Sequence, residues 1–473
     1  MRKVFFILLM LPAILLAAPV DPNLAQQVAQ NFIISTGDSL SVQQQTNQPS
    51  RLKRVAKQSS DTPPYYIFNN EEGGFVIVSG DDCATPILGY SYEGSIDLDN
   101  MPIQLQELLQ AYAAEIKEAV DNNLQATEEV AESWEAYRRA PLSQKTTTVV
   151  NALIATSWDQ YPRYNDLCPS DPSLANLGGH PTTGCVATAM AQVMKYWEYP
   201  EQGIGYHSYS SNRYGTLSAN FANTKYDWEN MPLKLSSSTS STQNNAVATL
   251  MYHCGVAVDM NYNSDSEGKG SSSAYLIDYG KGRASAEKAL KTYFGYASTV
   301  SGKKSSSMSS SAWEAMLKNE LDNKRPMLYR GAPSADSGGH AFICDGYDSN
   351  NKFHFNWGWS GSYNNGFFSL TALTPGNYNF SSSQQAVIGI KPADGSGPAK
   401  NYLLYMNTDL TALNTSNTGS SLDVNPYYYG TNMTFQARVE IMVLVRLMVH
   451  SELLHSRKTE NLLHGQKNRI LTH

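Results

Sequence analysis

A single cysteine in the stretch GGHPTTGCVATAMAQVMKYWEYP (178–200) is the first candidate for chemistry. Cys185 follows Gly184 and opens a run of good helix formers that ends at Pro200. A helix N-terminus has unpaired N–H groups and a partial positive charge, and both stabilise a thiolate. Because the thiolate is the nucleophilic form of cysteine, this position is typical of an activated nucleophile. The alternative is a small apolar thiol in the first turn of an ordinary buried helix.

A nucleophilic thiol needs a base, and His340 is the strongest candidate. It lies in SGGHAFICDGY, where two glycines leave the imidazole accessible and the apolar residues after it predict a strand. It follows Cys185 by about 155 residues, close to the ~130–150 residues typical of papain-like cysteine proteases. A surface histidine at a strand edge is the alternative. The other histidines of this region are His180, His207, His253 and His354.

Two further segments could complete such a site. The stretch FHFNWGW places Asn356 and Trp357 on a strand predicted to pair with the strand of His340. An amide there could accept the imidazole N–H, and an indole could shield the imidazole from water or simply pack in the core. In SWDQYPRYN, Gln160 lies 25 residues before Cys185. Its amide could donate to an oxyanion, although most such glutamines are solvated.

The composition limits the classes of function. A chain of 473 residues with 41% hydrophobic residues predicts two to four folded domains. The net charge of −7 argues against a large face for nucleic acid. Five cysteines are an odd number, so at least one thiol is unpaired. Neither CxxC nor HExxH spacing occurs, which argues against a zinc enzyme, and no metal or cofactor is expected.

The N-terminal third predicts an exported chain with a small first domain. Residues 1–18 have a basic start, 13 apolar residues and a small-residue exit, which is typical of a secretory signal peptide and too short to span a membrane. Residues 19–145 predict a small α+β domain, with strands at 65–68 and 75–79 and an amphipathic helix near 105–120. This domain ends in the polar linker RRAPLSQKTTT (138–148).

Residues 146–392 predict a larger α+β domain in two subdomains that meet at a cleft. Its first half is helical and its second half contains antiparallel strands. The helices are expected at 185–198, 245–255, 284–294 and 311–322, and the last opens with Ser311 and Glu314 spaced as a capping box. Residues 393–473 predict a linker, an incomplete β-module and, from about 440, a tail of different composition. This tail is either a truncated or frame-altered terminus or an ordinary amphipathic tail.

Three blocks of the sequence, TTGCVATAMAQVMKYWEYP, GGHAFICDGYD and FHFNWGWSGSYNNGFFSL, resemble the streptopain family of secreted cysteine proteases, including the interpain-like enzymes. The stretch FNNEEGGFVIVSGDD resembles the inhibitory pro-domain of that family. The resemblance implies a papain-like fold and a zymogen. It also implies Cys185 as nucleophile, His340 as base, Gln160 as oxyanion donor, and Trp357 at the orienting position with Asn356 beside it. The tail beyond about 440 departs from the family's usual extensions.

The sequence therefore predicts a secreted cysteine endopeptidase that acts on protein or peptide substrates. We expect its own pro-domain to inhibit it, with the 69–74 turn and the loop DDCATP (81–86) covering the cleft. No nucleic-acid partner and no membrane span are expected. The alternative is a non-catalytic secreted binding protein or adhesin built on a protease scaffold.

Overall fold

The chain divides into two compact units, 1–399 and 400–473, in the computed structural model. The structure describes residues 18–36, 52–55, 63–71, 73–139, 146–263, 270–331, 339–360, 365–373, 384–396, 437–438 and 470–471. In the second unit, the described strands β14 (Ala437–Arg438) and β15 (Ile470–Leu471) pair antiparallel. The rest of the predicted β-module and tail lies outside the described residues, as does the predicted signal peptide up to residue 17.

The N-terminal part of the first unit is the small α+β region that its residue patterns predict. It forms α1 (Pro22–Thr36), β1 (Leu52–Arg54), β2 (Tyr65–Asn70), β3 (Phe75–Ser79), β4 (Ile87–Ser91), α2 (Ile103–Asp121) and α3 (Glu128–Arg138). The helix α3 was not predicted. It begins after Thr127, whose hydroxyl accepts the N–H of Val130, and it extends to the residue where the linker was expected to start.

The remainder of the first unit has a helical half and a stranded half, as predicted. Its elements are β5 (Thr148–Val150), η1 (Pro172–Leu177), α4 (Cys185–Trp197), β6 (Tyr206–Ser211), β7 (Gly215–Asn220), η2 (Phe221–Asn223), η3 (Trp228–Asn230), α5 (Ser241–Ala257), α6 (Ala286–Thr292), β8 (Ser301–Lys304), η4 (Ser305–Ser307), α7 (Ser310–Asp322), β9 (Met327–Gly331), β10 (His340–Asp348), β11 (Phe353–Asn356), β12 (Gly366–Phe368) and β13 (Gln385–Ile388).

The predicted capping box of the last helix is wrong. Helix α7 begins after Ser309, whose hydroxyl accepts the N–H of Ala312, so Ser311 and Glu314 form no capping box. A capping box does occur at α5, where the Ser240 hydroxyl accepts the N–H of Gln243 and the Gln243 side chain accepts the N–H of Ser240. Several serines precede α7, and which of them caps the helix depends on where its first turn packs.

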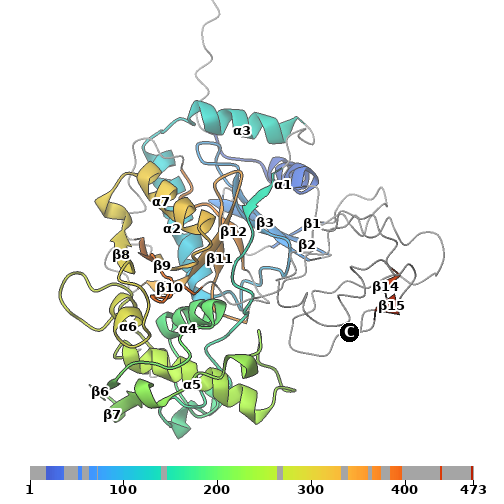
Figure 1. Ribbon diagram of the computed structural model, residues 1–473. Coiled ribbons are helices and arrows are strands. Elements are labelled where there is room, and N and C mark those ends of the chain that lie inside the picture. Colours follow the sequence, from blue (N-terminus) through green and yellow to red (C-terminus); the bar gives the residue numbers. More distant parts are fainter. Residues whose placement is uncertain are drawn as a thin grey trace, which may run out of the picture. The chain divides into compact units, whose positions relative to one another are not determined.

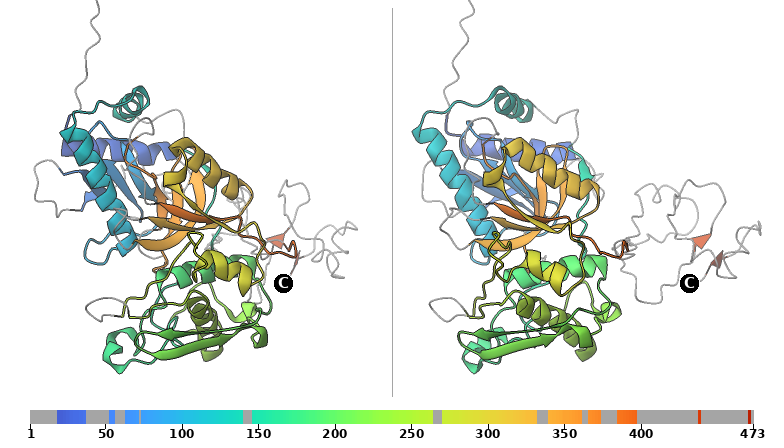
Figure 2. Two further views of the ribbon diagram at one scale, coloured as in Figure 1. Left: turned by 90° about the vertical axis from the view of Figure 1, so that its left-hand side faces the viewer. Right: turned by 60° about the vertical axis from the view of Figure 1, so that its left-hand side comes forward.

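An antiparallel sheet joins the two parts of the first unit. Its strand order is β1-β2-β3-β4-β12-β11-β10-β9-β13-β8, with β5 paired to β10. The junction is the antiparallel pair β4–β12, in which Phe367 lies opposite Tyr90 and Phe368 opposite Gly89. The strands of the N-terminal region therefore continue directly into the sheet that carries His340, and Figure 2 shows the blue and orange strands side by side.

Helices cover both faces of this sheet. Helix α2 places Leu105, Leu109, Tyr112 and Ile116 at spacings of four, three and four residues, and all four are buried in one core with residues of the β9–β12 strands. Helices α1 and α3 contribute to a separate core on strands β2–β4. The helical half, with α4, α5 and the β6–β7 hairpin, lies below the sheet in Figure 1. Among the described residues, no helix is long and apolar enough to cross a membrane.

Candidate active site

The helix that carries the predicted nucleophile begins at the cysteine itself. Gly184 is the N-cap residue of α4 and has a φ of 87°. A Cβ atom on this glycine would lie 2.7 Å from the Met260 side chain, so both the backbone conformation and the packing require glycine. Cys185 is partly exposed, whereas the other four cysteines are buried, and none of the five forms a disulfide.

The structure brings Cys185 next to the start of strand β10. The backbone N–H of Ala341 donates to Cys185 Sγ at 3.3 Å, and His340 is the preceding residue. The other candidate histidines have partners elsewhere. His180 contacts the Cys168 carbonyl, His207 contacts Asp259, His253 contacts Tyr226 and His354 contacts Asp345. His340 is therefore the histidine that the fold places beside the thiol, and its role as base stays a prediction.

Gln160 lies on a segment fixed to the residues before Cys185. Its carbonyl accepts the N–H of Thr183 at 3.2 Å, and its own N–H donates to Asp159 Oδ1 at 2.7 Å. The residue is buried, with 4% of its surface exposed. A buried glutamine this close to the helix start fits the predicted oxyanion donor better than the solvated alternative does.

The amide of Asn356 has partners other than the imidazole. It lies on β11, which pairs with β10 as predicted. Its Nδ2 donates to the Thr156 carbonyl at 2.9 Å, and its Oδ1 accepts the N–H of Gly358 at 3.1 Å. None of its hydrogen bonds among the described residues reaches His340. Trp357 is fully buried, with its ring 4.8 Å from that of Phe342, as the core-packing alternative expects.

The N-terminal region contributes two polar side chains to this place. Glu107 on α2 has its Oε1 3.7 Å from His340 Nε2. Gln104, one turn earlier, is buried and donates from Nε2 to the Trp357 carbonyl at 3.1 Å and to the Ala341 carbonyl at 3.4 Å. Its Oε1 accepts the indole N–H of Trp359 at 2.7 Å. Helix α2, rather than the loops expected to cover the cleft, makes these contacts.

Sequence reasoning missed both α2 residues, although a signal was present. Gln104 lies four residues before Leu108 and eight before Tyr112, so it shares the side of the helix that faces the core. A glutamine on such a face needs buried hydrogen-bond partners. The partners could not be named, because they lie more than 230 residues away in the chain.

The electrostatics of the site oppose a thiolate–imidazolium pair in this state. Burial raises the pKa of the Cys185 thiol, while backbone N–H groups, that of Ala341 first, act in the opposite direction and the Glu107 carboxylate raises it further. Burial also lowers the pKa of His340, and the nearby Arg330 guanidinium adds to this effect. A raised thiol pKa and a lowered imidazole pKa both favour the neutral pair, which is the less reactive form.

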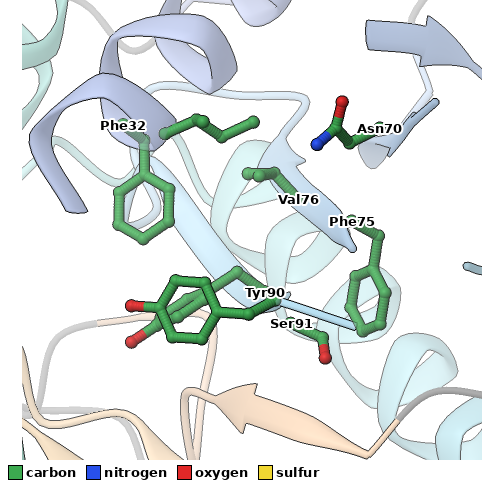
Figure 3. A pocket seen from close by; sticks show the side chains of 8 residues that line it. Phe32, Asn70, Phe75, Val76, Tyr90 and Ser91 are labelled. Atoms are coloured by element: carbon green, nitrogen blue, oxygen red, sulfur yellow. The ribbon is translucent and has the colours of Figure 1, made fainter. Parts of the chain in front are cut away.

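A cavity elsewhere in the molecule is not part of this site. It lies in the N-terminal region and is lined by residues of α1 and of strands β2 to β4 and the turn that follows them, as Figure 3 shows: Phe32, Ile33, Asn70, Phe75, Val76, Tyr90, Ser91 and Tyr92. Neither Cys185 nor His340 lines it.

Comparison with known proteins agrees with this geometry. Residues 158–368 match the model of the peptidase C10 family, and residues 17–116 match that of the Spi protease inhibitor. Streptopain of Streptococcus pyogenes is 35% identical over 351 residues, which cover 69% of this chain and 80% of streptopain. The thiol protease/hemagglutinin PrtT of Porphyromonas gingivalis is 32% identical over 423 residues, which cover 84% of this chain but only 45% of PrtT.

A solved structure supports the same assignment. A fragment of prointerpain A from Prevotella intermedia superposes with a TM-score of 0.57 at 31% identity, covering 72% of this chain and all of the fragment. The match extends over both the inhibitor-like region and the catalytic region, which the antiparallel sheet joins here. The chain therefore belongs to the peptidase C10 family of cysteine-type endopeptidases, and it carries the catalytic region of that family behind a region like the Spi protease inhibitor.

Proposed function

We propose that this chain is an exported endopeptidase for protein or peptide substrates, held inactive by its own residues 19–145. The observation that carries the proposal is the insertion of α2 at the Cys185–His340 site. Gln104 and Glu107 contact His340 and Ala341, the residue whose N–H binds the Cys185 thiol, so a substrate and the inserted helix compete for one place. The signal-like first 18 residues support export, and residues 146–392 form the proposed catalytic domain.

The proposed reaction is acyl transfer through a thioester. The Cys185 thiolate adds to the peptide carbonyl carbon, and Gln160 with the backbone N–H of Cys185 stabilises the oxyanion. When the C–N bond breaks, the His340 imidazolium gives its proton to the leaving amine. Water then adds to the thioester while His340 takes a proton from it, and collapse of this second intermediate releases the acid and the thiol.

A casein assay separates this proposal from the binding-protein alternative. The processed protein is expected to cleave casein in the presence of a reducing agent, and iodoacetamide is expected to abolish the cleavage. EDTA is expected to have no effect, because the proposed nucleophile is a thiol. Cleavage that survives alkylation would contradict the assignment of Cys185, and loss of cleavage with EDTA alone would favour a metalloenzyme.

The inhibitory region also contacts the catalytic region through Glu115, a buried carboxyl on α2. Glu115 Oε2 accepts the N–H of Ala372 at 2.6 Å and the hydroxyl of Thr371 at 2.7 Å, both in the catalytic region. Burial raises the pKa of this carboxyl to about 7, against the opposing effect of those hydrogen bonds. Burial therefore favours a protonated Glu115 despite these hydrogen bonds, and ionisation of Glu115 weakens the folded, docked state.

The burial of Glu115 makes the free energy of unfolding depend on pH, with a definite sign. Between pH ~4.5 and ~7 the folded chain binds the Glu115 proton while the unfolded chain releases it, so the stability due to this group falls as pH rises through that window. Relative to Glu115→Gln, the wild type is expected to lose about 2–3 kcal/mol of unfolding free energy between pH 5 and pH 8. Both chains would carry Cys185→Ala to prevent processing. Urea unfolding at the two pH values measures the difference, and a constant difference would contradict it.

A further inference from the structure

Gln192 is a buried polar residue on the same side of α4 as Cys185. It follows Cys185 by seven residues, which is two helical turns, and only 1% of its surface is exposed. Most of its neighbours on the helix are apolar. A fully buried amide must have its hydrogen bonds satisfied, so its partners indicate what it holds in place.

The oxygen of Gln192 binds the segment that leads to Gln160. Oε1 accepts the hydroxyl of Thr156 at 2.9 Å and the backbone N–H of Trp158 at 3.1 Å. Trp158 lies two residues before Gln160. Gln192 Oε1 therefore connects the helix of the nucleophile to the segment of the proposed oxyanion donor.

The nitrogen of Gln192 binds the loop after β11. Nε2 donates to Asn356 Oδ1 at 3.4 Å, and the Asn356 amide binds the Thr156 carbonyl and the Gly358 N–H. Gly358 has a φ of 73°, and a Cβ atom on it would lie 3.1 Å from the Thr188 methyl group on α4. The loop therefore runs tightly along the helix at this point.

The two segments that Gln192 holds are also bound to each other. The Ser360 N–H donates to the Trp158 carbonyl at 3.2 Å, and the Ser360 hydroxyl donates to Asp159 Oδ2. The other oxygen of Asp159 accepts the N–H of Gln160. Movement of either segment relative to α4 would thus shift Gln160 and the loop of Trp357 and Trp359 together.

We propose that Gln192 is a positioning residue for the proposed reaction, on which this inference rests. It sets the distance of the Gln160 segment and the 356–360 loop from Cys185 without touching the substrate. An apolar side chain at this position leaves the Trp158 N–H and the Thr156 hydroxyl without their acceptor, so both segments shift. A shift of about 1 Å at a reacting group can cost ~100-fold in rate.

The test compares Gln192→Met with Lys195→Met. Lys195 is a matched control on the same helix, because it is buried and donates to the Trp228 carbonyl, away from the site. Full-length chains would be processed with trypsin under conditions in which the wild type reaches its full activity, and the trypsin is then inhibited. Gln192→Met is expected to lower kcat for a peptide ~10–100-fold with KM changed less than ~3-fold, whereas Lys195→Met lowers the melting temperature but not kcat.

Two readouts distinguish positioning from general destabilisation. In a Gln160→Ala background, Gln192→Met is expected to cost less than ~3-fold, since both act through the same amide. The rate of Cys185 alkylation by iodoacetamide should stay within ~3-fold of wild type, because the hydrogen bond from the Ala341 N–H to Cys185 Sγ is not changed. Additive losses in kcat, or a parallel fall in alkylation, would overturn the proposal.

Thr156→Val decides the question if Gln192→Met does not fold. It removes one hydrogen bond to Gln192 and keeps the Thr156 carbonyl, so a ~3–10-fold loss in kcat is expected, and unchanged kcat would overturn the proposal. Cys185→Ala separates the positioning role of Gln192 from the proposed protease function. If that variant is inactive while Gln192→Met and Thr156→Val are fully active, the positioning role fails and the proposed function stands.

Discussion

Cys185→Ala is expected to lower the cleavage of casein by at least ~10⁴-fold, because no other group of the site can form the thioester. Alanine suits the first turn of α4 at least as well as cysteine, and Gly184 still supplies the N-cap conformation. The fold should therefore be retained. The variant should also stay full length, whereas the wild type is expected to shorten by cleavage between 138 and 149.

Cys254→Ala is the matched control for this variant. Cys254 is fully buried on α5, and its sulfur contacts the Met194 sulfur at 3.6 Å, so its loss creates a small cavity away from the site. It is expected to lower stability and to keep kcat within ~3-fold of wild type. Residual casein cleavage by Cys185→Ala, measured after purification free of wild-type enzyme, would remove Cys185 from the proposed mechanism.

Local patterns predicted the elements that carry the site. The start of α4 at Cys185 followed from a glycine placed before good helix formers, and the β10–β11 pair followed from two apolar runs of strand length. Both signals lie within a few residues of the feature that they predict. Helix α3 was missed because it has only three buried residues, Val130, Trp134 and Tyr137, in a segment of 11 residues of which five are charged.

The partners of the polar side chains could not be predicted in the same way. Asn356 was expected near the imidazole from its position in the strand, but its amide binds Thr156 and Gln192, which are 200 and 164 residues away. Hydrogen bonds of this kind are set by how the two halves of the molecule pack. The sequence indicates only that a buried amide requires such partners.

The same reason explains why the contacts between residues 19–145 and the catalytic region could not be predicted. Strand β4 pairs with β12, and α2 packs in one core with Phe355 and Phe368. The sequence of a strand that is apolar on both faces does not indicate which strand will pair with it. The shared sheet indicates that cutting the linker alone leaves extensive contacts to be broken before the site opens.

Removal of the two polar side chains of α2 is therefore expected to expose the thiol of the uncut chain. Gln104→Ala/Glu107→Ala loses the hydrogen bonds to the Trp357 and Ala341 carbonyls and to the Trp359 indole, and it removes the contact with His340. It also removes a carboxylate that raises the pKa of Cys185. The uncut wild type is expected to react with iodoacetamide ~100-fold more slowly than the processed enzyme. The uncut double variant is expected to react at a rate within ~10-fold of that of the processed enzyme.

Intact-mass spectrometry can follow this reaction on the uncut chain, because Cys185 is partly exposed and the other four cysteines are buried. The matched control is Gln110→Ala/Glu118→Ala, which removes the same two residue types from the exposed side of α2. It should label as slowly as the wild type. Equal labelling of all three uncut chains would mean that α2 does not hold the site inactive. Fast labelling of the double variant alone would assign the inhibition to Gln104 and Glu107, since the sheet and the apolar contacts of α2 are unchanged in it.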